Sequence, residues 1–149
     1  MFLSNNPGVD RRQHRLMFRD AWLKRINGEA VNQLDKQIAD VVEEHPEYHK
    51  LVETLNDNDP VELLDLSQGQ DTDNPFLHMG LHLGLREQVG TDRPSGIRLI
   101  TQSLLKRFPG DGHRVEHMMM ECLAEFLWQS QRDSKPPDEA AYLEALRRL

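Results

Sequence analysis

Helical periodicity constrains the fold of this chain more than any other feature of its sequence. Ile97, Ile100 and Leu104 recur at intervals of three and four residues, a spacing that places them on one face of an α-helix. No stretch alternates apolar and polar residues for long, so strands are not expected. The pattern therefore predicts an all-α protein, folded as a compact helical bundle of about five to seven helices.

Capping residues and turn formers mark where these helices begin and end. Asn74 can accept hydrogen bonds from free amides, while Pro75 fills a first-turn position that needs none. At 149 residues the chain has the length of one ordinary domain, so we expect a single helical domain over 1–149. The predicted elements are helices at 10–27, 32–44, 46–55, 75–89, 95–108 and 111–131, a long acidic connection at 56–74 and a short C-terminal helix at 138–148.

The charge of the chain excludes some partners and favours others. A net charge of −7 argues against nucleic-acid binding, because the neutralisation of phosphates requires clustered lysine and arginine. Residues 10–25 nevertheless hold six basic and two acidic side chains, a charge of +4, and residues 35–73 hold two basic and twelve acidic ones, a charge of −10. A protein partner could bind through the basic first helix or the acidic connection. An internal match between the two segments, or solvated helix faces, would explain the same pattern.

The apolar runs of the sequence are short. None reaches the length of about 20 residues that is needed to cross a bilayer. The opening "MFLSNNPGVDRR" also lacks the charged-then-apolar order of a signal peptide. We therefore expect no membrane partner and a cytoplasmic location.

Six of the seven histidines fall into pairs with the same spacing. On a helix, positions four apart differ by only about 40° in direction, so two imidazoles can project from one face and hold one ion. Surface contacts or core hydrogen bonds would use the same spacing, so a structural histidine network is the alternative to a metal site. The pairs are His45 and His49, His78 and His82, and His113 and His117.

Glu121 extends the last of these pairs into a stripe of two histidines and a carboxylate. It follows His117 by four residues and lies in a segment, 118–128, in which nine of eleven residues are apolar. We expect this segment to be buried nearly all round. A buried carboxylate requires an arginine, a hydrogen-bond network or a metal ion. Zinc, iron, manganese and nickel all accept a mixture of imidazole and carboxylate ligands.

The order of the helices predicts that two of the pairs meet. In an up-down-up arrangement the helices that begin at Pro75 and Asp111 run parallel, and each carries its histidines within its first two turns. Such a metal-binding bundle could act as a metal-dependent enzyme; the alternative is a non-enzymatic interaction or regulatory module with a structural histidine network. The expected cofactor is a divalent transition metal, either iron, zinc, manganese or nickel. The predicted ligands are His78, His82, His113, His117 and Glu121.

Three further side chains stay open as ligands. Pro46 places His45 at or before a helix start, so regular spacing to His49 is not assured and a capping or surface role is favoured for His45. His49, on the first turn that follows, could still approach the site. Glu87 lies about 140° round the helix from His82 and would bind only if the helix were distorted.

Several segments of the sequence resemble those of a known family. They are "EHPEYH", "NPFLHMGLHLGLREQ", "DRPSGIR", "EHMMMECLAEFLWQSQRD" and "PPDEAAYL", and they are similar to the signature segments of the proteobacterial domain-of-unknown-function 1841 family, which is uncharacterised. The likeness spans nearly the whole chain and implies a compact cytoplasmic bacterial protein, without an activity or a ligand set. The inventory of histidines and carboxylates is also loosely similar to that of hemerythrin-like and DinB-like metal-binding bundles, an analogy that does not supply a function.

Overall fold

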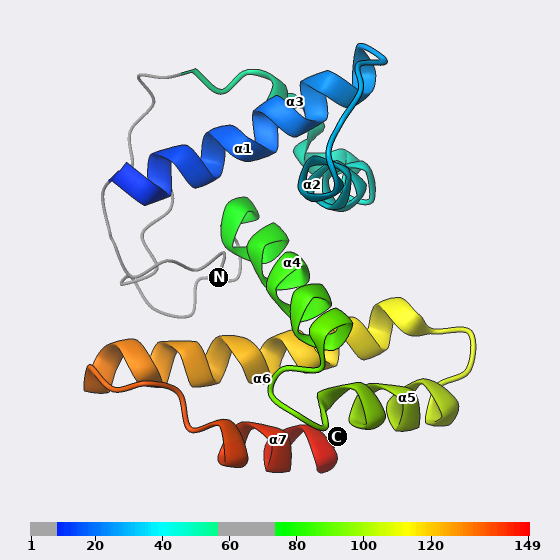
Figure 1. The fold of residues 1–149 in the computed structure, drawn as a ribbon, viewed down its shortest axis with the longest axis vertical. Coiled ribbons are helices and arrows are strands. Elements are labelled where there is room, and N and C mark those ends of the chain that lie inside the picture. The colour runs from blue at the N-terminus through cyan, green and yellow to red at the C-terminus, as the bar shows by residue number, and fades with distance from the viewer. Residues whose placement is uncertain (1–8, 57–73) are drawn as a thin grey trace. The chain divides into compact units, whose positions relative to one another are not determined.

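The chain is all-α throughout the part that the structure describes. A computed structural model describes residues 9–56 and 74–149, and within these ranges it contains helices and no strand. This confirms the predicted fold class. The elements are α1 (Val9–Ile26), α2 (Gln33–Glu43), the 3₁₀-helix η1 (Pro46–Tyr48), α3 (His49–Glu53), α4 (Pro75–Thr91), α5 (Ile97–Arg107), α6 (Gly112–Asp133) and α7 (Glu139–Arg147) (Figure 1).

Side-chain caps fix the starts of α2, α6 and α7. Asn32, Asp111 and Asp138 precede α2, α6 and α7, and each accepts a hydrogen bond from the backbone N–H three residues further on. These bonds satisfy amides that have no partner within the helix. The predicted boundaries of these helices are therefore correct to within a few residues.

Two predicted helices differ from the observed elements at their first turns. The segment 46–55 is divided into η1 and α3, with the first turn wound as a 3₁₀-helix behind Pro46. The helix predicted from residue 95 begins only at Ile97, because Gly96 has a φ of +106°, which is outside the helical region. The side chain of Asp92 caps this start by accepting hydrogen bonds from the N–H groups of Gly96 and Arg98.

The described residues fall into two compact units. The first contains residues 9–56 and 74–83, and the second contains residues 84–149. The single domain over 1–149 stays a prediction. The acidic connection predicted at 56–74 lies outside the described residues except for its two ends.

The core of the first unit is built by α1, α2, α3 and the first turns of α4. α1 packs most extensively against α2 and also contacts α3. The ring of Phe18 on α1 meets the ring of Phe76 on α4 edge to face, with centroids 5.9 Å apart. The buried residues of this core are Phe18, Ala21, Trp22, Ile38, Ala39, Val41, Val42, Val52, Leu55, Phe76, Met79 and Leu83.

Opposite charges on α1 and α2 are paired within this unit. Lys24 forms an ion pair with Asp35 at 3.0 Å, and Arg25 forms one with Asp40 at 2.8 Å. Desolvation raises the pKa of Asp40, but hydrogen bonds from Arg25 and Lys36 outweigh it, so the pKa of this carboxyl lies below its ordinary value. Part of the basic charge of α1 is thus matched inside the chain.

The second unit packs α5, α6 and α7 around an apolar core (Figure 1). One polar group enters that core. The hydroxyl of Tyr142 on α7 donates a hydrogen bond to Gln88 Oε1 at 2.8 Å, and burial raises the pKa of this phenol. The buried residues are Leu85, Ile97, Ile100, Leu104, Val115, Met119, Met120, Leu123, Tyr142, Leu143 and Leu146.

The described helices are short or carry many charged residues. None of those in residues 9–56 and 74–149 has the length and apolar character that a membrane span requires.

Candidate metal centre

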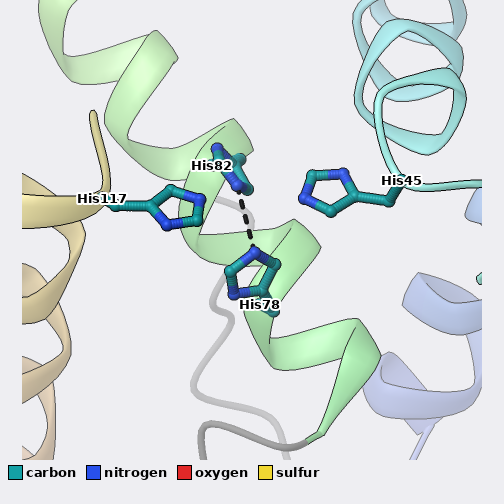
Figure 2. A group of neighbouring side chains, drawn as sticks. All are labelled: His45, His78, His82 and His117. Carbon is teal, nitrogen blue, oxygen red and sulfur yellow. Dashed lines mark hydrogen bonds between the residues drawn. The ribbon is translucent and has the colours of Figure 1, made fainter. Parts of the chain in front are cut away.

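His78 and His82 lie one turn apart on α4. Asn74 and Pro75 set up a regular first turn, because the Asn74 side chain accepts hydrogen bonds from the N–H groups of Phe76 and Leu77. The two imidazoles then project from the same face, with ring centroids 4.8 Å apart. Their Nε2 atoms share a hydrogen bond of 3.2 Å, the dashed line in Figure 2. The side chain of His82 has no exposed surface.

His45 reaches these two rings from the segment between α2 and η1. It leaves the helical conformation, with φ −124° and ψ 71°, and its ring points towards His78 and His82 (Figure 2). Its Nδ1 lies 2.7 Å from the carbonyl oxygen of Val41. Because a carbonyl can only accept, Nδ1 carries the proton and Nε2 presents a lone pair.

The Nε2 atom of His45 is buried without a hydrogen-bond partner among the described residues. Only 4% of the residue is exposed, so bulk water does not compensate for the missing bond. Leaving a buried acceptor unsatisfied costs about 1–3 kcal/mol. The environment of His45 is therefore unfavourable for a histidine whose role is only to fill the core.

The three rings form a triangle with nearly equal sides. The centroid of His45 lies 5.0 Å from that of His78 and 4.8 Å from that of His82, and candidate ligand atoms of the three residues lie within 4.8 Å of one another. For bonds of about 2.0–2.1 Å, tetrahedral coordination requires nitrogens about 3.3–3.4 Å apart and ring centres about 5.2 Å apart. The spacing of the rings is thus close to the spacing that a shared ion requires.

The two histidines of the "HPEYH" segment make different contacts. His49 Nε2 donates a hydrogen bond to the carbonyl of Val42 at 2.7 Å, and its ring packs on Trp22 with centroids 4.4 Å apart. His45 instead faces α4, and the ring of Tyr48 stacks on it at 5.5 Å with an interplanar angle of 6°. Both histidines cap the last turn of α2, but only His45 belongs to the candidate centre.

The remaining pair of histidines lies on α6 in the second unit. The rings of His113 and His117 have centroids 4.1 Å apart, with an interplanar angle of 46°. His113 is exposed and His117 is half-buried. His117, which Figure 2 also draws, belongs to the second unit. The meeting of this pair with His78 and His82 stays a prediction.

Glu121 is exposed, which corrects the argument from its burial. The sequence predicted that residues 118–128 would be buried nearly all round. Most of this segment is buried or half-buried, and the fully buried face of α6 is formed by Val115, Met119, Met120 and Leu123. Glu121 is the exposed exception within 118–128, and its carboxylate therefore needs no ion to compensate it. Glu87 is exposed as well.

His45 is the residue that sequence reasoning undervalued. The sequence favours a capping or surface role for His45. The side chain does cap the last turn of α2, but it is buried and not at the surface. A signal was present in the sequence, because a histidine just after a helix can donate Nδ1–H to the carbonyl four residues back and leave Nε2 free. That signal becomes specific only when other ligands face it.

Comparison with known proteins identifies the family of this chain but does not identify a ligand. A family model described as "Domain of unknown function (DUF1841)" matches residues 10–148. No curated protein and no solved structure matches the chain.

Proposed function

The chain belongs to the DUF1841 family, whose description assigns no activity, and from the site itself we propose that it binds a divalent transition metal ion through His45, His78 and His82. An ion ligated by imidazole nitrogens fits zinc, iron or nickel better than manganese, which prefers oxygen ligands. The setting that we propose for this function is the bacterial cytoplasm.

The buried Nε2 of His45 is the observation that carries the proposal. Metal-bound histidines characteristically donate their other ring N–H to a carbonyl or a carboxylate, which fixes the tautomer and orients the ring. The bond from His45 Nδ1 to Val41 is of this kind. A metal ion would occupy the lone pair that the described residues leave unsatisfied.

The hydrogen bond between His78 and His82 has to open when the ion binds. One Nε2 donates to the other, so one of the two rings has its proton where the ion would bind. For both rings to ligate as neutral imidazoles, that proton must be replaced by one on Nδ1 of the same ring. Because only neutral imidazoles ligate, metal affinity should fall in acid.

Of the other ligands predicted from the sequence, this proposal includes one and does not require two. His117 is proposed as a fourth ligand, on the argument from helix order. The proposal requires neither His113 nor Glu121, because both are exposed. A protein with this centre would bind metal whether or not it catalyses a reaction.

A structural histidine network is the competing candidate. It is favoured by the hydrogen bond between His78 and His82 and by the bonds of His45 and His49 to backbone carbonyls. It would make the protein a non-enzymatic interaction or regulatory module. The metal centre and the structural histidine network predict different results with zinc, because only the metal centre would bind it.

Metal titration of untagged protein tests the proposal. After treatment with a chelator and dialysis, calorimetric titration with zinc and elemental analysis should both give one ion per chain. Loss of a ligand should weaken binding at least as much as the 10–100-fold that loss of a supporting hydrogen bond costs, so we expect His45→Gln to lower the affinity about 100-fold or more.

His49→Gln is the matched control, because it changes the other histidine of the same segment and keeps a donor for Val42. Its zinc affinity should equal that of the wild type. Absence of zinc uptake by the wild-type protein, or equal affinities in the wild type and His45→Gln, would establish the structural network instead.

A further inference from the structure

The candidate ligands of the proposed centre are all electrically neutral. Among the described residues, the group that could hold a metal ion consists of histidines and includes no carboxylate or thiol. An ion bound by neutral imidazoles keeps its full double positive charge. The same is true if His117 completes the set, because it is also a histidine.

This charge would lie in a poorly hydrated place. His82 has no exposed surface and only 4% of His45 is exposed. An uncompensated buried charge costs several kcal/mol even after the protein relaxes. A divalent ion at this position therefore needs negative charge nearby.

The described carboxylates of the first unit have other partners or face solvent. Asp35 and Asp40 pair with basic side chains of α1, and Glu53 accepts a hydrogen bond from Trp22. The polar residues that the described part of this unit buries are Arg15, His45 and His82, and none of them carries a negative charge. Nothing in this set balances the charge of a bound divalent ion.

We infer that an ion held by these histidines binds a small monovalent inorganic anion as an additional ligand. This inference rests on the proposed metal-binding function and specifies the class of ligand that the loaded centre takes up. An anion that coordinates directly supplies the missing charge where the cost of burial is largest. We specify a small anion because His45 and His82 are almost completely enclosed by the protein.

Cobalt-loaded protein allows the anion to be followed directly, because the visible ligand-field spectrum of cobalt responds to a change of its ligands. Untagged full-length protein would be loaded with one equivalent of cobalt and titrated with sodium azide at constant ionic strength. We expect a saturable spectral change with one azide per cobalt. Perchlorate, which coordinates poorly, should leave the spectrum unchanged, and this separates coordination from the screening of charge by salt.

Two variants bracket this result. His78→Gln removes a ligand at a partly exposed position, and both the cobalt spectrum and the azide response should be lost. His113→Gln changes an exposed histidine of the second unit and should retain both. Circular dichroism would show that each variant is folded.

The outcomes separate this inference from the function on which it rests. A cobalt spectrum with one ion per chain that azide does not change would overturn the anion inference and leave metal binding intact. If neither cobalt nor zinc binds, both the inference and the proposed function are wrong. An identical response to azide and perchlorate would also overturn the inference, because it would show that no anion coordinates.

Discussion

The first unit encloses Arg15, His45 and His82 in its interior, whereas the buried residues of the second unit are apolar apart from the phenol of Tyr142, among the residues that the structure describes. Burying a polar side chain costs free energy unless it is paired. A core that served only stability would favour the composition of the second unit. The buried polar groups of the first unit, which include two of the three proposed ligands, are therefore in keeping with the proposed metal centre.

The histidine pairs of the two units sharpen the comparison. His78 and His82 have the same spacing as His113 and His117, and both pairs bring their rings within 5 Å of each other. The first pair has a buried member, His82, and a third imidazole of its own unit beside it, supplied by His45. Spacing along a helix thus produces a pair of rings, and a donor from another segment is needed to turn the pair into a centre.

Substitution of His82 by glutamine should give the largest difference between the units. Zinc at a thousand times its dissociation constant should stabilise the wild-type protein by about 4 kcal/mol through linkage. The variant should lose this increment, because one ligand of the centre is missing. Thermal unfolding with and without zinc measures the increment in each protein.

Ile97→Val is the matched control in the second unit, where Ile97 has no exposed surface. It should lower the free energy of unfolding by about 0.5–1.5 kcal/mol and retain the full zinc increment. The assignment of metal binding to the first unit would fail if His82→Gln kept the increment or if Ile97→Val lost it.

Tyr142→Phe should have a smaller effect, confined to the second unit. The substitution removes the hydroxyl that donates a hydrogen bond to Gln88 Oε1. The part-buried Oε1 atom is then left without this bond, at a cost of about 1–2 kcal/mol. Urea unfolding measures this loss, and the zinc increment should be unchanged. A variant as stable as the wild type would show that the hydrogen bond contributes nothing net to the second unit.

The smallest expected effect is an acid sensitivity due to His14 in the first unit. Burial lowers the pKa of His14 below 6.5. As the pH falls below 6.5, the unfolded chain therefore takes up a proton that the folded chain still excludes, and the free energy of unfolding decreases. Urea unfolding of chelator-treated protein at several pH values should show a weaker decrease for His14→Gln. Equal decreases in the two proteins would contradict this role.

The helices could be predicted from the sequence because their signals are local. Asn32, Asp111 and Asp138 cap helices with their own side chains, and the rings of His78 and His82 are adjacent through helical geometry alone. These features depend on residues within a few positions of one another. They need no knowledge of how distant segments pack.

The rest of the candidate centre depends on packing between distant segments. His45 approaches α4 only because the end of α2 packs where it does, and nothing in "HPEYH" specifies that neighbour. For Glu121, a segment with nine apolar residues in eleven does not reveal which face of α6 the other helices cover. Exposure of this carboxylate is therefore a result of tertiary structure.

The packing of Trp22 on His49 gives the protein a built-in optical signal. The indole is buried and lies 4.4 Å from an imidazole that is bonded to the last turn of α2, the same turn that holds His45. Trp128, the other indole, lies beneath the guanidinium of Arg132 at 4.8 Å on α6. A Trp128→Phe variant would leave an emission spectrum due to Trp22 alone. Changes at the carboxyl end of α2 could then be read from its intensity without attaching a dye.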